Sequence, residues 1–274
     1  MSVLLMTVWL TGCVQEEFES TPSPAGNGIR FTLTVPDVNL PSVSSRTMTG
    51  TGTAKKEDEI ETVDILVFDM SKTPAVFLEW VSATGVTQDL ADNSTVSFSA
   101  VLSPTTASTC IVVVANKELD NIVPGFIKGT TTKVEAMEKM LHTQTGKWLA
   151  DGSTTGGYTR IPMYGEKVIS KITPSMNPIT EINMKRMLAR IDIRNNSATS
   201  NFTVEEVYLA NHNTTGYIAP AWNTNGQVTD PVPDTPVLPA GSGKMTEEGD
   251  VIRYSVNGNT PYDGEIYTFE SLAA

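Results

Sequence analysis

The sequence contains few of the residues from which catalytic and metal centres are commonly built. It has only two histidines, His142 and His212, and they lie far apart among its 274 residues. It contains no HExxH, CxxC, GxSxG or Walker motif, and Asp89, Asp92 and Asn93 do not have the spacing of a calcium loop. We therefore expect no catalytic residue, no metal site and no cofactor. The enzymatic alternative is a glycosidase, whose two carboxylates can lie anywhere in a sequence.

Cysteine is equally scarce, and its two copies do not define a disulfide framework. Cys110 lies in an apolar run, where a free thiol behaves as a small buried apolar residue. Cys13 follows an apolar stretch near the amino terminus, where we do not expect it to be folded in.

Basic residues are outnumbered by acidic ones, 19 to 31, and the net charge is −12. No basic cluster stands out, because Lys55 and Lys56 are followed at once by Glu57, Asp58 and Glu59. An acidic surface repels phosphate backbones, so we expect no nucleic acid among the partners.

No apolar run is long enough to span a bilayer, which takes roughly 20 residues. Residues 3–10 are apolar and suit the central part of a secretory signal. The letters LTGC that close this stretch look like a bacterial lipobox. We therefore expect residues 1–13 to be a lipoprotein signal peptide and lipobox, with Cys13 as the lipidated residue that anchors the protein in a membrane. The alternative is a chance apolar terminus, since no Lys or Arg precedes the run.

Residues 14–28 are acidic and then rich in Pro and Gly, which is typical of a flexible tether. Gln15, Glu16 and Glu17, just after the cysteine, resemble the surface-export signal of Bacteroidetes lipoproteins. An ordinary acidic tether is the alternative.

A first strand is predicted by strict alternation of apolar and polar residues. Ile29, Phe31, Leu33 and Val35 lie on one face of residues 29–35, which is the pattern of a half-buried strand. A long polar connection at 36–59 then separates this strand from the rest of the chain.

The remaining pattern is that of an all-β protein with short strands and many turns. Central strands are expected at 60–69 and 109–116, where aliphatic residues occupy both faces. One short amphipathic helix is expected at 133–142. Further strands are expected at 75–82, 94–102, 161–165, 168–172, 179–194 and 202–210, with a long loop at 218–249 and a hairpin that pairs 251–256 with 265–270.

Several segments, taken in order, resemble one known family. After the lipobox comes an SRT site at Ser45, Arg46 and Thr47. The other segments are EDEIETVDILVFD at 57–69, TCIVVVANK at 109–117, IPMYGE at 161–166, MKRMLARIDI at 184–193 and EIYTFE at 265–270. Together they resemble the Bacteroidales fimbrillins, the FimA-like subunits of type V pili, over nearly the whole chain.

The resemblance implies two transthyretin-like β-sandwich domains, at 29–178 and 179–274, in a surface-exposed outer-membrane lipoprotein that forms part of a fimbrium. It implies that an Arg-specific protease cuts between Arg46 and Thr47. The displaceable first strand then leaves a groove, which a strand of another pilus subunit fills by β-strand addition. The implied role is adhesion, with a host protein or glycan as a further partner.

The carboxyl end departs from the family, whose members continue with further strands after a Tyr-x-x-Glu element. We therefore expect the second domain to be shortened at its C-terminal end. Two alternatives to a polymerising subunit stay open. One is a pilus anchor or stand-alone surface lipoprotein that binds glycan or protein without polymerising, and the other is an incomplete gene product.

Overall fold

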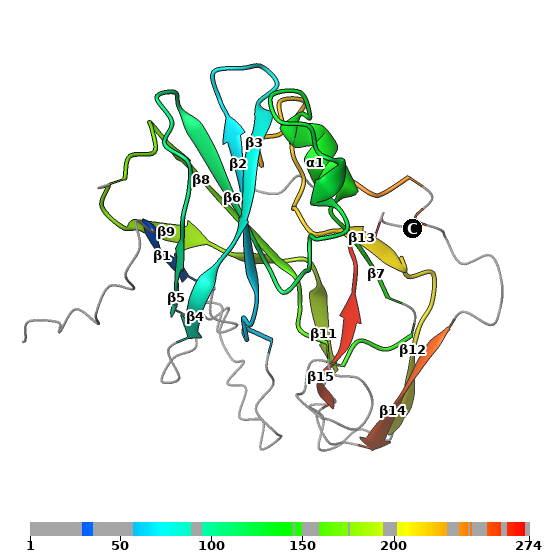
Figure 1. The fold of residues 1–274 in the computed structure, drawn as a ribbon. Coiled ribbons are helices and arrows are strands. Elements are labelled where there is room, and N and C mark those ends of the chain that lie inside the picture. Colours follow the sequence, from blue (N-terminus) through cyan, green and yellow to red (C-terminus); the bar gives the residue numbers. More distant parts are fainter. Residues whose placement is uncertain are drawn as a thin grey trace, which may run out of the picture.

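The computed structural model describes residues 29–34, 57–88, 95–144, 146–149, 159–174, 176–193, 202–228, 236–240, 242, 251–258 and 262–271. Within these residues the chain is an all-β protein with one short α-helix, as the sequence predicted (Figure 1). Two sheets form a sandwich, and smaller two-stranded sheets lie beside it.

The first sheet of the sandwich has four strands, in the order β4 (Thr84–Gln88), β5 (Thr95–Ala100), β1 (Ile29–Thr34) and β9 (Ile179–Asn183). β1 is antiparallel to β5 and parallel to β9. Alternate residues of β1 are buried, as expected for a strand with one face on a core.

The second sheet has five strands, in the order β10 (Lys185–Arg186), β8 (Met163–Ile169), β6 (Thr109–Ala115), β2 (Val63–Asp69) and β3 (Val76–Ser82). All neighbouring strands in it are antiparallel. β2 and β6 are buried along both faces, which confirms that their consecutive aliphatic residues indicated central strands.

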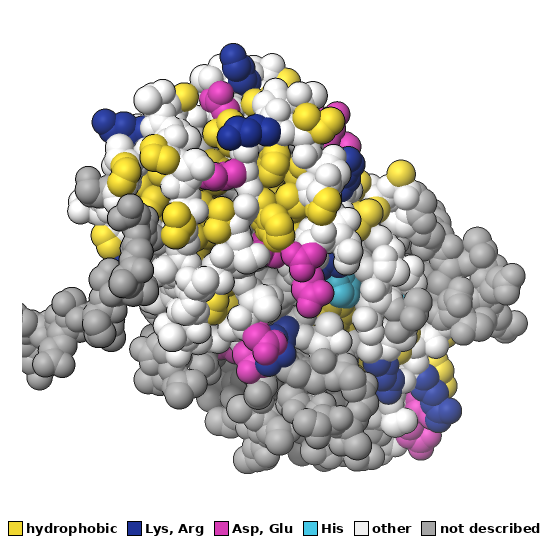
Figure 2. All heavy atoms as spheres, viewed as in Figure 1, with side chains coloured by type: hydrophobic (Ala, Val, Ile, Leu, Met, Phe, Trp, Pro, Cys, Tyr) yellow, Lys and Arg dark blue, Asp and Glu magenta, His cyan; other side chains and the backbone are white. Residues whose placement is uncertain are grey.

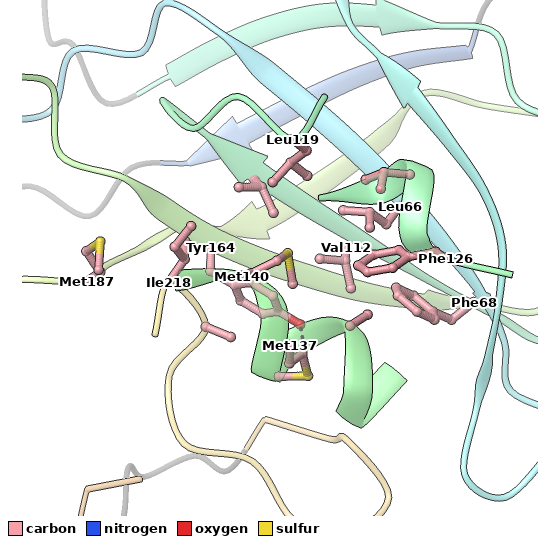
Figure 3. Packing of buried hydrophobic residues seen from close by; sticks show 14 of the residues in the cluster. Leu66, Phe68, Val112, Leu119, Phe126, Met137, Met140, Tyr164, Met187 and Ile218 are labelled. Atoms are coloured by element: carbon pink, nitrogen blue, oxygen red, sulfur yellow. Dashed lines mark hydrogen bonds between the residues drawn. The ribbon is translucent and has the colours of Figure 1, made fainter. Parts of the chain in front are cut away.

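The second sheet is buried on both faces because it separates two apolar cores. One core lies between the two sheets and contains alternate residues of β1, β5, β2 and β6. The other lies on the opposite face, which α1 (Lys133–Lys139) and later segments of the chain cover. Figure 3 shows Val112 of β6 and Tyr164 of β8 beside Met137 of α1 and Met140, which follows the helix.

The helix is shorter than the expected 133–142. It begins with a capping box, in which the Thr132 side chain accepts from Glu135 N and the Glu135 side chain accepts from Thr132 N. It ends at Lys139 because Leu141–Thr143 form the strand β7, which pairs with β13 (Thr215–Tyr217). A 3₁₀ turn at Val123–Gly125 precedes it.

In the described part of the chain, each of two continuous segments contributes one edge strand to each sheet of the sandwich. β3 is an edge of the second sheet, and β4, which follows after Ala83, is an edge of the first. In the same way β9 and β10 are edges of different sheets and are joined by Met184, which is fully buried. The expected single strand at 179–194 is therefore wrong, because the chain changes sheets within it and forms β9, β10 and β11 (Ala189–Ile193).

Two two-stranded sheets lie beside the sandwich, toward the lower right of Figure 1. β11 pairs with β15 (Tyr262–Thr268), and β12 (Val204–Leu209) pairs with β14 (Ile252–Gly258). A small core that contains Ile252 and Ile266 lies between them. The expected hairpin is wrong, because no ladder joins β14 to β15 among the described residues and each strand pairs with an earlier one.

The expected division of the chain at residue 178 stays a prediction. β9 begins directly after it and pairs with β1 in the sandwich. Tyr267 and Phe269 of the last described segment lie in the core that α1 covers. In the part of the chain that the structure describes, no helix is long and apolar enough to cross a membrane.

Gly165 of β8 lets the turn from β9 to β10 lie directly against the second sheet. A Cβ atom on this residue would come within 2.7 Å of Met184 Sδ and 2.9 Å of Ile182 Cγ2. We expect Gly165→Ala to lower the free energy of unfolding by about 1–3 kcal/mol, because it overpacks this contact, and urea unfolding measures the loss. Gly125→Ala is the control, since nothing lies within 4 Å of an added Cβ there. Equal losses in the two variants would contradict the packing argument.

Candidate functional site

Three of the site residues expected from the sequence lie in the described part of the chain. Ile29, Phe31 and Leu33 point from β1 into the core between the two sheets and are at most 4% exposed. The other four lie outside the described residues, namely Cys13, Val35, Arg46 and Thr47. Lipidation and processing therefore stay predictions. The candidate site consists of β1 and of the contacts that hold the residues on either side of segment 35–56.

β1 is an inner strand that fills a position between β5 and β9. Its ladder with β5 runs without a register shift from Ile29 to Thr34. The apolar residues face apolar partners across it, Phe31 opposite Phe98 and Leu33 opposite Val96. The two phenylalanine rings stack with centroids 5.0 Å apart and planes 6° apart. β1 therefore contributes both main-chain hydrogen bonds and side chains of the core.

The β9 side of β1 is less regular. Phe31 and Leu33 lie opposite Ile179 and Ile182, and the register shifts between them. Residues three apart in a regular strand point to opposite faces, yet both isoleucines are buried. Glu181, whose φ is 61°, takes up the extra residue as a bulge. This bulge allows both isoleucines to reach the core beside β1.

The two residues that flank segment 35–56 are bound to one short stretch of chain. Met184 N donates to Thr34 O at 2.9 Å, and Arg186 Nε donates to Glu57 O at 3.1 Å. The chain therefore leaves β1 and re-enters the described structure near the same turn, the one between β9 and β10.

Glu57 is the centre of a buried polar network. Its carboxylate accepts two hydrogen bonds from Arg190 Nη1, at 2.7 and 2.9 Å, and one from the Tyr267 hydroxyl at 2.6 Å. The side chains of Glu57 and Arg190 are 5% and 14% exposed. Burial of a carboxylate is costly unless donors surround it, so these contacts fix the residue in place. The end of the expected connection 36–59 thus belongs to the folded body.

Asn116, directly after β6, binds the chain that follows Glu57. Its Oδ1 accepts from Glu61 N at 3.0 Å, and its Nδ2 donates to Glu59 O at 2.7 Å and to Ile161 O at 3.0 Å. Its φ of 57° lies in the left-handed region, which asparagine adopts more readily than most residues. The residue therefore ends the central strand and ties it to the chain that follows Glu57.

The chain after Tyr267 is also fixed against the sandwich. Phe269 is buried in the core that α1 covers, and Asn213 Nδ2 donates to Glu270 O at 2.5 Å. A Cβ atom on Gly216 of β13 would come within 2.5 Å of Phe269 Cδ1. Glycine at this position therefore permits the last described segment to dock.

An aromatic cluster surrounds this contact. The His142 ring lies 4.9 Å from the Trp148 ring and 6.4 Å from the Phe269 ring, measured between centroids. Burial lowers the pKa of His142 to about 4, and the charge of Lys117 adds to the shift. His142 is therefore neutral at neutral pH and acts as a packing residue. The adjoining cleft, lined in part by Trp148 and His212, has room for about one water molecule.

A second buried ion pair lies beneath the turn that contains Gly226. Lys133 Nζ donates to Glu166 Oε2 at 2.5 Å and to Gly226 O at 2.6 Å, and its side chain is 1% exposed. The Tyr164 hydroxyl donates to the same carboxylate, and burial together with that charge raises the pKa of Tyr164. Burial raises the pKa of Cys110 to about 12. The Cys110 thiol is free and buried. This confirms that Cys110 acts as a small apolar residue, as the sequence predicted.

These networks bring together the five segments of 57–69, 109–117, 161–166, 184–193 and 265–270. The sequence does not predict the role of Glu57, Arg190 or Tyr267, because a carboxylate in a polar run is usually solvated. The available signal was the pair of arginines in MKRMLARIDI, whose alternating apolar residues indicated a partly buried strand. A buried arginine needs an acidic partner, but the sequence does not say which one.

Exposed charges follow no single pattern of sign. On the face seen in Figure 2, acidic side chains lie next to basic ones, and no extended basic patch is visible. Arg160, for example, pairs with Glu59 at 3.2 Å and with Glu61 at 2.7 Å. Among the described residues no group of three or more potential metal ligands occurs. The buried polar residues hold distant segments of the chain together.

A family comparison identifies the class of protein to which this fold belongs. The chain is a member of the family of Fimbrillin-A associated anchor proteins Mfa1 and Mfa2, whose model matches residues 21–269. The resemblance to fimbrillins is thereby confirmed, and the chain has a role in fimbriae at the cell surface.

Solved structures of similar architecture share little sequence with this chain. A fimbrial assembly protein from Parabacteroides distasonis is 10% identical, with 89% of this chain and 77% of that chain covered and a TM-score of 0.41. A protein from the same organism, proposed to act in cell adhesion, is 14% identical, with 91% and 72% covered and a TM-score of 0.47. A comparison with curated proteins gave no match. The assignment rests on the family match alone.

We expect Glu57→Gln to lower the free energy of unfolding by roughly 3 kcal/mol, because it leaves the buried Arg190 without this carboxylate. Urea unfolding followed by tryptophan fluorescence measures the change. Glu61→Gln is the matched control, since the Glu61 side chain is 61% exposed in its pair with Arg160 and exposed pairs contribute about 0–1 kcal/mol. A loss in Glu57→Gln no larger than in the control would contradict the proposed importance of the network.

Proposed function

We propose that this protein is a fimbrial subunit that is exported as a lipoprotein through Cys13, reaches the surface of the outer membrane and assembles by protease-triggered strand exchange. An Arg-specific protease cuts after Arg46, and β1 leaves with the amino-terminal piece. A strand of another fimbrial protein takes its place by β-strand addition. The assembled fimbrium serves adhesion to a host protein or glycan, and the subunit itself catalyses no reaction.

The position of β1 is the observation that carries this proposal. β1 lies inside its sheet between β5 and β9, and the chain that joins it to β2 contains Arg46. A cut in this connection leaves β1 attached to the later strands by non-covalent contacts alone. Departure of an inner strand exposes two strand edges at once, and exposed edges are what an added strand pairs with.

A cut at Arg46 does not by itself release β1. Ile29, Phe31 and Leu33 are buried, and full burial of such a side chain stabilises by roughly 1.5–3 kcal/mol. The regular ladder with β5 adds main-chain hydrogen bonds. Release therefore requires an incoming strand that restores both kinds of contact, which favours exchange over simple loss.

The other side of the cut is held independently. Glu57 keeps its hydrogen bonds to Arg190 and Tyr267 whether or not the chain before it is intact, because none of these residues lies in segment 35–56. Asn116 binds the residues that follow Glu57. These contacts support a processed chain that stays folded from Glu57 onward.

The last described strand is engaged within its own chain, which supports a role as strand acceptor. β15 pairs with β11, and Tyr267 and Phe269 are 5% and 4% exposed in the core that α1 covers. Side chains that fill their own core are not available to a neighbouring molecule. We therefore expect the cleaved protein to accept a strand from another subunit without forming long polymers of itself.

A second function is favoured by the description of the family, which names anchor proteins. In this alternative Arg46 is not cut, Cys13 keeps its acyl chains and β1 stays in place. The protein then binds glycan or another fimbrial protein from the membrane surface without polymerising.

Mass spectrometry of the surface-located chain tests the proposal. Strand exchange predicts a mature chain that starts at Thr47, and an Arg46→Ala variant that stays uncut and is absent from purified fimbriae. Lys55→Ala is the control within the same segment and should be processed normally. A native chain that keeps residues 14–46 and an acylated Cys13 within fimbriae would support the anchor instead.

A second variant, Cys13→Ser, tests the lipid anchor. If it still reaches the outer-membrane surface, lipoprotein export is contradicted for both the strand-exchange subunit and the anchor.

A further inference from the structure

We propose that the strand which replaces β1 carries an aromatic residue at the position of Phe31, with an aliphatic residue two positions to each side, and that it runs in the same direction as β1. This inference rests on the strand exchange proposed above and specifies the partner by its chemistry. The partner is a strand of another fimbrial protein with the pattern aliphatic-x-aromatic-x-aliphatic.

The aromatic position is defined by Phe98 on β5. The rings of Phe31 and Phe98 lie 5.0 Å apart with nearly parallel planes, and the two residues are 1% and 3% exposed. If β1 leaves, the face of the Phe98 ring loses the ring that covers it. Only a flat side chain of similar size restores this contact, because an aliphatic side chain has a different shape and a small one leaves a cavity.

The two flanking positions are aliphatic because of what lies across them. Ile29 pairs with Ala100 and Leu33 with Val96, so each has a smaller apolar partner on β5. The second sheet closes the core opposite them with residues of β2 and β6, including Val67 and Ile111, which are fully buried. Leu33 is itself fully buried. A polar side chain at either position would be desolvated without a hydrogen-bond partner.

The positions of β1 that face away from the core are less selective for the type of side chain. Thr32 lies opposite Ser97 and Arg30 opposite Ser99, and both are only partly buried. Water remains in reach of side chains on this face, so small changes there leave the core unchanged. These positions supply the matched controls for the aromatic one.

The direction of the strand is set by its two neighbours. A strand that runs as β1 does is antiparallel to β5 and parallel to β9. The bulge at Glu181 places Ile179 and Ile182 opposite Phe31 and Leu33 for this direction. A reversed strand would be parallel to β5 and would meet the bulge in a register that does not match these side chains.

Displacement by peptides from the cleaved full-length chain tests the inference. The chain is cut after Arg46, or at a protease site inserted in segment 35–56 if that arginine resists. A labelled peptide of residues 28–36 is the reference ligand, and fluorescence anisotropy with native mass spectrometry follows its exchange for the bound piece. We expect the Phe31→Ala peptide to bind at least about 100-fold more weakly, Phe31→Leu about 10-fold more weakly, and Thr32→Ala within about threefold of the reference. A spin label at the amino end of the bound reference peptide should broaden the amide signal of Ala100, the β5 partner of Ile29, more strongly than that of Thr95, the partner of Thr34.

A second variant isolates the stacked pair. In a Phe98→Leu protein the loss of affinity caused by Phe31→Leu in the peptide should be smaller, because the ring that stacks on Phe31 is absent. If the reference peptide exchanges but the Phe31→Ala and Thr32→Ala peptides bind equally well, the aromatic requirement is wrong and strand exchange still stands. Stronger broadening at Thr95 than at Ala100 would refute the assigned direction. If the reference peptide never replaces β1, both this inference and the proposed strand exchange fail.

Discussion

A buried carboxylate near the start of the sandwich determines how the distant parts of this chain meet. Glu57 is bound by Arg190 and Tyr267, which lie 133 and 210 residues further along the sequence. Because a carboxylate leaves water at low cost only when donors surround it, β11 and β15 must lie where Glu57 can be reached. Met184 and Arg186 hold the two flanks of segment 35–56. One short stretch of chain, Met184 to Arg186, therefore holds both the end of the first strand and the point where the described structure resumes.

The five-stranded sheet separates the core that contains β1 from the core that contains the last described segment. β1 packs on one face of this sheet, in the core shared with β5. Tyr267, Phe269 and α1 pack on the other face. Since β2 and β6 are buried on both sides, removal of β1 opens one core and leaves the other closed. This arrangement supports the proposed strand exchange, because the core on the other face keeps its contacts.

Some strands could be predicted from the sequence because the order of their apolar residues shows which faces are buried. The alternation in β1 and the aliphatic runs in β2 and β6 gave nearly correct bounds, because burial of one face or both appears in neighbouring residues. The expected strand at 179–194 was wrong because the crossing at Met184 depends on Gly165 and on the edge of another sheet. The expected hairpin was wrong because the alternation of apolar residues in β14 and β15 does not show which strands they pair with. The role of Glu57 was missed for the same reason, since its partners are remote and its own surroundings are acidic.

Hydrogen exchange measured by mass spectrometry on the intact and the cut chain tests the central claim, that non-covalent contacts on either side of segment 35–56 hold the protein together. Amide protection reports local opening of each segment. The account predicts that, after a cut at Arg46, the amides of 30–34, 57–61, 189–191 and 266–268 stay as protected as before, and that 30–34 alone changes when a competing strand is added. Loss of protection at 57–61 and 266–268 on cutting, before any strand is added, would contradict it.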